Sequence, residues 1–367
     1  MIRRLWPLAL LAIVVPAAPA SALTARDGRA RAVRAYRALQ RNYYLTDQKI
    51  YRGTSNSYLW PYSQALGATI SVAGLRYHEH GRMEAAVRDR LAGLGRYFDA
   101  KAVPQAYSAN PGPYLSHYKY YDDNEWVGLE LLRRYHQVRE PFLLQRAKAI
   151  FKLAVFGWDR NSAHACPGGV LFSQRPWNQA RNAITNAPAA EMGLRIYQYT
   201  HETYYLQWAK RMYDWVRRCL QIKGSELYFD RIDFKGLIPR AVLTYDEGPM
   251  LGASVLLYRV TGQARYLKRA QAMAREAMKF FSRGRLRNDP PAWSGILFEN
   301  LLLLDAVRPN PGYRRYVEAW ADHGWNKLRD PATDLFPPNG PQATAVATQS
   351  AFAKVFALLA TEPAAIP

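Results

Sequence analysis

Two adjacent carboxylates, Asp122 and Asp123, lie among aromatic residues in the stretch Tyr120-Tyr121-Asp122-Asp123-Asn124-Glu125-Trp126. Paired carboxyl groups cleave glycosidic bonds, because one handles the proton while the other acts at the anomeric carbon. Aromatic rings beside them offer flat apolar surfaces on which pyranose rings stack. The stretch therefore indicates a sugar-cleaving site.

A structural alternative exists for the same residues. Asp122 followed by Glu125 has the spacing of a helix capping box, in which both side chains bind the free backbone N–H groups of the first turn. One carboxylate is enough to cap a helix, and the second, adjacent one adds repulsion between like charges. We therefore favour the catalytic interpretation of Asp122 and Asp123.

Three further junctions between a loop and a helix carry acids, amides or rings: 182–186, 244–248 and 293–295. An aromatic residue, Trp60, occurs near the N-terminal end as well. The residues that we expect to contact substrate are Trp60, Tyr121, Asn124, Asn182, Asn186, Tyr245, Asp246 and Glu247. The alternatives are helix caps or core amides for the asparagines, first-turn acids for Asp246 and Glu247, and plain core for Trp60.

Helical periodicity dominates the chain, and no segment shows sustained period-2 alternation. The predicted helices are 25–44, 56–79, 82–99, 123–138, 141–156, 182–200, 202–221, 247–261, 263–283, 294–308, 310–328 and 342–360. An internal repeat joins them. A helix ends in an aromatic residue, a short turn follows, and the next helix opens with an aromatic–aliphatic pair; Leu143, Leu206, Leu267 and Val317 mark the copies.

Such helical hairpins predict an all-α fold, an (α/α)6 barrel with inner and outer helix rings. The inner helices should be apolar nearly all round and the outer ones amphipathic. An open α-solenoid is the alternative. The tight turns then share one rim, and the long loops 102–121, 157–181, 223–246 and 284–293 share the other. Long irregular loops on a rigid scaffold usually carry function.

The N-terminal residues 1–22 have the features of a secretory signal, with Arg3 and Arg4 before an apolar run and a small-residue cleavage site at Ala20-Ser21-Ala22. No later stretch is apolar for long enough to span a membrane. We expect residues 23–367 to form a single catalytic domain that is exported, either secreted or periplasmic.

The chain has two cysteines, Cys166 and Cys219. In an oxidising compartment an even count favours a disulfide, and two buried thiols are the alternative. No Cys or His pair has the spacing of metal ligands.

The net charge of +21 suggests an anionic neighbour. The basic residues are scattered along helices, and no nucleic-acid motif is present. We favour a solvated basic surface that contacts an anionic cell envelope, without nucleic-acid binding.

Tyr121-Asp122-Asp123-Asn124-Glu125-Trp126 resembles the signature of glycoside hydrolase family 76, the endo-α-1,6-mannanase family. Later blocks match in the same order, and the resemblance covers most of the chain after about residue 50. These blocks are Gly168-Gly169, Asn182-Ala183-Ile184-Thr185-Asn186, Tyr245-Asp246-Glu247-Gly248, Leu251-Gly252-Ala253 and Leu257-Tyr258-Arg259-Val260-Thr261-Gly262.

The resemblance implies an (α/α)6 barrel that hydrolyses α-1,6-linked mannose backbones with retention of configuration and without a metal or organic cofactor. It implies that Asp122 is the nucleophile and that Asp123 is the acid and base. The family more often has Tyr-Asn-Gln-Gly where this chain has Tyr245-Asp246-Glu247-Gly248. Val127 also replaces an aromatic residue, and the Gly-Gly block lacks its usual Trp. These departures concern the substrate subsites more than the acid pair.

The leading hypothesis is an exported, monomeric endo-α-1,6-mannanase acting on a mannan or a lipomannan-like polysaccharide. Another (α/α)6 sugar enzyme, such as an uronyl hydrolase or an epimerase, is one alternative. A glycan-binding or transglycosylating envelope protein with the same cleft is the other.

Overall fold

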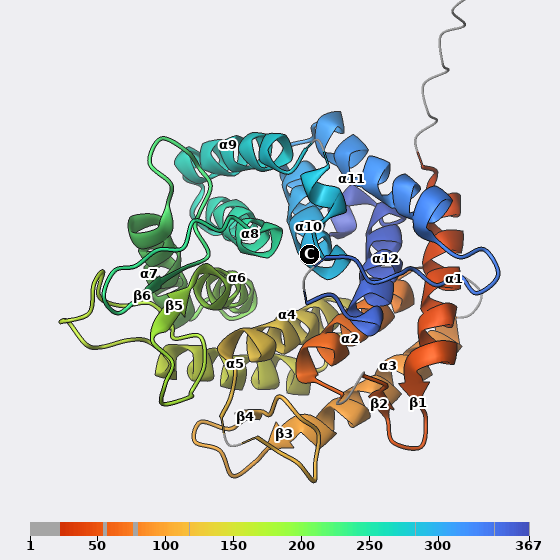
Figure 1. Ribbon diagram of the computed structural model, residues 1–367, viewed down its shortest axis with the longest axis horizontal. Helices are drawn as coiled ribbons and strands as arrows, with labels where there is room; N and C mark the ends of the chain where they lie inside the picture. The colour runs from red at the N-terminus through yellow and green to blue at the C-terminus, as the bar shows by residue number, and fades with distance from the viewer. Residues whose placement is uncertain are drawn as a thin grey trace, which may run out of the picture.

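The computed structural model describes residues 23–366 except 54–56, 76–79, 117, 283 and 341, so the expected signal segment lies outside it. Twelve α-helices of this part form two concentric rings (Figure 1). The inner ring contains α2 (Leu59–Ala73), α4 (Tyr121–Val138), α6 (Ala183–Thr200), α8 (Thr244–Thr261), α10 (Pro291–Val307) and α12 (Ala345–Leu359). The outer ring contains α1 (Ala25–Tyr43), α3 (His80–Leu94), α5 (Pro141–Phe156), α7 (Thr203–Leu220), α9 (Ala264–Phe280) and α11 (Pro311–His323).

The inner ring is closed. Each inner helix packs against the inner helix before it and the one after it, and α12 packs against α2. This closure confirms the (α/α)6 barrel and excludes the open solenoid. The last hairpin joins the two ends of the described chain, because the outer helix α1 packs on α12.

The two rings differ in the way their side chains are distributed. The inner helix α12 is rich in Ala, Val, Phe and Leu, and almost all of its residues are buried. The outer helix α9 buries Tyr266, Ala270, Met273, Ala274 and Ala277, which lie three or four residues apart on one face. Its Lys and Arg side chains occupy the other face, as expected for a helix that covers a core on one side only.

The predicted repeat is confirmed by the turns and by the packing. Helices α4, α6 and α8 all end at a residue with left-handed backbone geometry, namely Arg139, His201 and Gly262, with φ of 57°, 56° and 69°. The next outer helix starts within two residues in each case. The repeat positions all contact the core, and these are Leu143, Leu206, Leu267 and Val317.

Helix ends are the main departure from the sequence prediction. The predicted helix 56–79 is too long, because α2 starts at Leu59 and ends at Ala73; residues 54–56 and 76–79 lie outside the described part. The predicted helix 82–99 also runs too far. After α3, Gly95–Tyr97 forms a 3-10 turn, and β3 (Phe98–Asp99) pairs with β4 (Ala106–Tyr107).

Two other short antiparallel pairs brace the loops. They are β1 (Tyr44–Leu45) with β2 (Ile50–Tyr51) and β5 (Ala180–Asn182) with β6 (Arg231–Asp233). A disulfide joins Cys166 in the loop after α5 to Cys219 at the end of α7, with Cα atoms 6.0 Å apart. Among the helices of the described part, none is both long and apolar enough to cross a membrane.

Candidate active site

A cleft of about 490 Å³ lies where the inner helices begin. Every inner helix contributes a residue from its N-terminal end: Trp60 of α2, Asp122, Asp123 and Trp126 of α4, Ile184 of α6, Tyr245 of α8, Trp293 of α10 and the N-cap Thr344 of α12. The adjoining loop and helix positions add Tyr58, Pro61, Ala109, Asn110, Ser116, Tyr120, Phe172, Arg175 and Gln342. The barrel thus brings together the loop-to-helix junctions that the sequence analysis singled out.

Asp122 and Asp123 occupy the first turn of α4, and both are half-buried at the cleft. The helix starts at Tyr121, two residues earlier than predicted. Its N-cap residue, Tyr120, makes no side-chain hydrogen bond to the first turn. Both carboxyl oxygens of Glu125 are buried without a hydrogen-bond partner. The capping box considered for Asp122 and Glu125 is therefore not formed, and capping does not explain the acid pair.

The two aspartates differ in how firmly they hold a proton. Burial raises the pKa of Asp122 to about 7, opposed by the backbone N–H groups of Asp123 and Asp122, while the charge of Asp230 adds to the rise. Burial, followed by the charge of Asp122, raises the pKa of Asp123 well above its ordinary range. Two close carboxyls cannot both ionise readily. Because the helix N–H groups favour the charged form of Asp122, the pair loses its first proton there and keeps the second on Asp123.

Aromatic pairs form the walls of the cleft. The rings of Trp60 and Trp126 lie 5.7 Å apart between centroids, and those of Tyr245 and Trp293 lie 4.4 Å apart. A third pair, formed by Tyr120 and Phe172 at 5.5 Å, stands on the side of the second long loop. These rings give the cleft flat apolar surfaces on either side of two carboxyl groups, which suits a pyranose chain.

The structure places four of the expected site residues on the cleft: Asp122, Asp123, Trp60 and Tyr245. Tyr121 is not among them. Its side chain is 2% exposed and packs on Gly157, where a Cβ would collide with the ring. The expected substrate contact of Tyr121 is therefore corrected, because the first residue of α4 points into the wall behind the cleft.

Asn124, Asn186 and Glu247 are also corrected, since their side chains hold the backbone of the preceding loop instead of lining the cleft. Each accepts a hydrogen bond from a buried N–H group upstream, and Gln349 of α12 does the same; we call these four residues the loop clamps. The bonds are Tyr107 N–H to Asn124 at 2.7 Å, Val170 N–H to Asn186 at 2.8 Å, Tyr228 N–H to Glu247 at 2.8 Å and Phe336 N–H to Gln349 at 3.0 Å. The clamps fix the long loops over the inner helices.

Asn182 and Asp246 lie behind the cleft, around a carboxylate that the sequence analysis missed. Asp230 accepts hydrogen bonds from Asn182 at 3.3 Å and from Arg231 at 2.6 Å. Both oxygens of Asp246 are buried without a partner. Burial, then the charges of Asp230, Glu247 and Asp122, raise the pKa of Asp246 well above its ordinary range.

Asp246 therefore keeps its proton behind the cleft.

In the described part of the chain, no group of three or more His, Cys, Asp or Glu side chains is arranged to hold a metal ion.

Several residues on the cleft were not among the expected substrate contacts. Trp293 is one of them, although the junction 293–295 that contains it was noted; like Trp60 and Tyr245, it lies at the start of an inner helix. Phe172 and Arg175 come from the interior of a long loop, where no local pattern marks the residues that turn toward the cleft.

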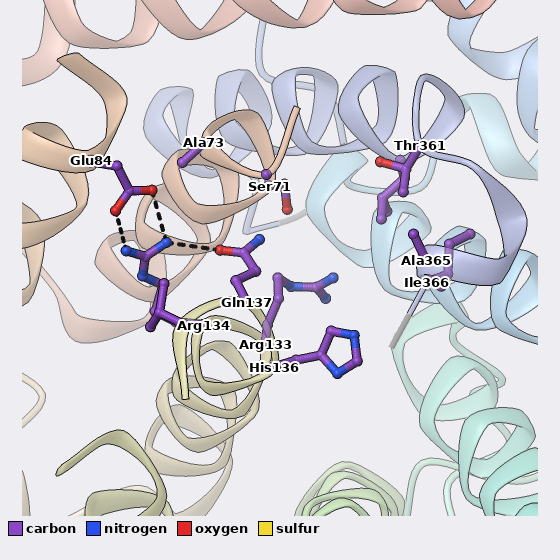
Figure 2. Close-up of a pocket in the computed structure, with 13 residues that line it drawn as sticks. Ser71, Ala73, Glu84, Arg133, Arg134, His136, Gln137, Thr361, Ala365 and Ile366 are labelled. Atoms are coloured by element: carbon purple, nitrogen blue, oxygen red, sulfur yellow. Dashed lines mark hydrogen bonds and ion pairs between the residues drawn. The ribbon is translucent and has the colours of Figure 1, made fainter. Parts of the chain in front are cut away.

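A second cavity, of about 750 Å³, lies at the opposite end of the barrel. Figure 2 shows Arg133 and His136 of α4 on the side of Thr361 and Ile366, whereas Arg134 points toward Glu84. Its lining includes one carboxylate, Glu84, which Arg134 binds. Basic side chains near helix C-termini complement the helix dipole. The described residues that line this cavity do not bring together the two carboxyls that glycoside hydrolysis needs.

The comparisons with solved structures agree with this architecture. A family 76 glycoside hydrolase (mannosidase) from Bacteroides thetaiotaomicron superposes with a TM-score of 0.81 over 91% of this chain and 98% of that one, at 22% identity. An inactive variant of the α-1,6-mannanase of Salegentibacter sp. HEL1_6, with two consecutive aspartates changed to asparagine and α-1,6-mannotriose bound, gives 0.73 over 91% and 99%, also at 22% identity. This likeness shows a shared fold.

Curated relatives match part of the sequence. Mannan endo-1,6-alpha-mannosidase DCW1 of Saccharomyces cerevisiae is 28% identical over 153 residues, or 40% of this chain and 33% of that protein. The Candida albicans protein of the same name is 23% identical over 248 residues, or 63% of this chain and 52% of that protein. The chain spans about a third of the length of the first of these relatives.

The model of "Glycosyl hydrolase family 76" matches residues 28–307, well over half of the chain. The match includes the acid pair, the Gly-Gly block and the starts of α4, α6, α8 and α10. The chain belongs to glycosyl hydrolase family 76.

Proposed function

We propose that this protein is an endo-acting, retaining glycoside hydrolase that cleaves α-1,6-mannosidic linkages in a mannan-type polysaccharide. The observation that carries the proposal is the cleft to which all six inner helices contribute, with the adjacent residues Asp122 and Asp123 among aromatic rings. The names of the relatives support the substrate class. The inactive relative that holds α-1,6-mannotriose supports a reaction that depends on two consecutive aspartates.

The different pKa shifts of the two aspartates support distinct roles for them in this proposal. Asp122 ionises first and is the nucleophile, because the N–H groups of the first turn and the helix dipole stabilise its charge. Asp123 keeps its proton, because burial and the charge of Asp122 oppose ionisation, and it is the general acid. A retaining pair needs carboxyls about 5–5.5 Å apart, a distance that neighbouring residues of one helical turn can span.

The reaction has two steps. In the first, a carboxylate oxygen of Asp122 bonds to the anomeric carbon, the glycosidic C–O bond breaks, and the proton of Asp123 passes to the leaving oxygen. In the second, the Asp123 carboxylate takes a proton from a water molecule, whose oxygen bonds to the anomeric carbon as the ester bond to Asp122 breaks. The proton returns to Asp123, and both carboxyls end as they began.

The remaining site residues act in two ways in this proposal. Trp60 and Tyr245 contact the sugar, together with Trp126 and Trp293, because their rings line the cleft. The loop clamps and Asn182 position the loops and the acids behind the cleft. We also propose that the protein is exported, that it is monomeric, and that its basic surface contacts an anionic envelope.

The test is a digest of linear α-1,6-mannan with Asp122→Asn and Asp123→Asn, with the product anomer read by NMR. Each variant should lose roughly a thousandfold or more of the activity, and the wild type should first release the α anomer. Glu125→Gln is the matched control, since it changes a buried neighbouring acid that does not line the cleft, and it should keep most of the activity.

The two aspartate variants should also differ from each other. An activated aryl glycoside of α-1,6-mannobiose needs no proton on its leaving group, so Asp123→Asn should still form the glycosyl-enzyme from it while Asp122→Asn should not. Binding of mannan by the wild type without release of reducing ends, or release of the β anomer, would overturn the proposal.

A further inference from the structure

One group of aromatic and basic side chains continues outward from the cleft along the second long loop. Trp177 has 65% of its surface exposed, and its ring lies 5.7 Å from that of Tyr118, at an interplanar angle of 75°. The guanidinium carbon of Arg175 lies 5.6 Å from the Trp177 ring and 5.0 Å from the Tyr120 ring. We call Tyr118, Arg175 and Trp177 the aromatic ledge.

The ledge is continuous with the cleft. Arg175 and Tyr120 both line the cleft, and Arg175 lies against Tyr120 on one side and Trp177 on the other. A chain that leaves the acid pair past Tyr120 and Phe172 therefore meets Arg175 and then the exposed indole.

The ledge is also held in place. Trp177 sits in a turn closed by a hydrogen bond from the N–H of Asn178 to the carbonyl of Arg175, at 2.9 Å. Just before this turn, Gln174 exchanges two hydrogen bonds with Lys119, at 2.9 and 3.1 Å, which joins the second long loop to the first. A binding surface fixed before the ligand arrives loses less entropy when the ligand binds.

Packing does not explain the ledge. An indole with about two thirds of its surface in water gains little from burial, and single exposed aromatic residues on a protein are ordinary. Here, however, the exposed ring is part of a chain of contacts that ends at the catalytic cleft. In the described part of the chain, the guanidinium of Arg175 has no carboxylate partner, so its N–H groups are available to hydroxyl oxygens.

We propose that the aromatic ledge is an additional sugar-binding subsite, which holds a mannosyl unit of the polysaccharide beyond those bound in the cleft. The apolar face of the pyranose stacks on Trp177, and Arg175 donates hydrogen bonds to its hydroxyls. The inference rests on the proposed function and deepens it, because it makes this protein favour long chains over short oligosaccharides.

The experiment compares Trp177→Ala with the wild type on a series of α-1,6-mannooligosaccharides and on the polymer. If the stacked sugar is worth about what an aromatic pair is worth, KM on the polymer should rise about threefold to tenfold. The rise should shrink as the substrate shortens, and Trp177→Phe should restore part of the affinity. Phe142→Ala, which removes a 57% exposed ring beside the tight turn before α5, is the matched control and should keep the wild-type KM on every substrate.

A binding measurement separates this inference from the proposed function. In the Asp122→Asn, Asp123→Asn background, affinity electrophoresis in mannan should show weaker retention when Trp177 is also changed to Ala. If the wild type fails to cleave α-1,6-mannan, the proposed function fails, whatever the ledge does. If the wild type cleaves it and Trp177→Ala has no effect, or the same effect at every chain length, the ledge is not a subsite.

Discussion

Glu247, the loop clamp in α8, is an acid, whereas the other three loop clamps have amide side chains. Asn124, Asn186 and Gln349 each accept a backbone N–H group and also donate to a backbone carbonyl, at distances of 3.0, 3.3 and 3.0 Å. Glu247 accepts in the same way, but its second oxygen, Oε2, is buried without a partner. Only a protonated carboxyl can supply the donor that an amide would supply. Burial accordingly raises the pKa of Glu247 well above its ordinary range.

We therefore expect Glu247→Gln to stabilise the protein, by an amount that grows with pH. The unfolded chain releases this proton near pH 4.5, whereas the folded protein keeps it. Above that pH, folding must take up a proton, and the free energy of unfolding falls by about 1.4 kcal/mol per pH unit until the pH passes the folded pKa. Gln carries no proton and loses nothing, so the advantage of the variant increases by about the same 1.4 kcal/mol per pH unit over this window.

Urea unfolding of both proteins between about pH 5 and pH 7 measures this difference directly. The reverse change, Gln349→Glu, is the matched control: it should lose stability increasingly over the same range. A Glu247→Gln variant that is less stable than the wild type, or whose advantage stays constant with pH, would show that Glu247 is ionised in the fold.

Two further changes test what holds the barrel and its loops together. Lys354→Met should destabilise the protein by about 3–5 kcal/mol, because Lys354 binds Glu130 at 2.5 Å and Glu299 at 2.8 Å, and both acids are buried or nearly so. A loss below about 1 kcal/mol in urea unfolding would show that the ion pairs of Lys354 with Glu130 and Glu299 are as weak as pairs on a protein surface. Cys219→Ser opens a loop with a sequence separation of 53 and should cost up to about 4 kcal/mol in the chain-entropy model. The wild type in reductant should then unfold like this variant, and a variant that still responds to reductant would contradict the assignment.

The fold was predictable because its physical signals are local and repeated. Inner helices that are buried on every side must be apolar on every side, and α12 shows this directly in its sequence. Outer helices such as α9 carry a single buried stripe. The short turns after α4, α6 and α8 recur with the same left-handed residue, and a recurring hairpin of this kind packs into a ring or a solenoid. Closure itself was not visible in the sequence, since it depends on the contact between α2 and α12.

The site was predictable only in part, because the choice of side chains depends on the rotation of each helix. One residue turns a helix by about 100°, so an error of two residues in a predicted start reverses the face. The helix predicted from residue 123 begins at Tyr121, and the one predicted from 247 begins at Thr244. With the observed starts, the second residue of α2, α4, α6 and α8 faces the cleft, while the fourth residue of α4, α6 and α8 is a loop clamp. The clamp partners lie 16 to 19 residues upstream, beyond the reach of a local pattern.

The observed start of α8 also changes the role expected for the two acids in Tyr245-Asp246-Glu247-Gly248. From the sequence, Asp246 and Glu247 were expected to contact substrate. The structure turns both behind the wall, where burial raises the pKa of each well above its ordinary range. As long as they keep their protons they are neutral, like the amides that they replace, and they add no negative charge beside Asp122. The departure from the family pattern therefore leaves the charge of Asp122, the proposed nucleophile, unopposed, and we expect its cost to appear as a stability that declines with pH.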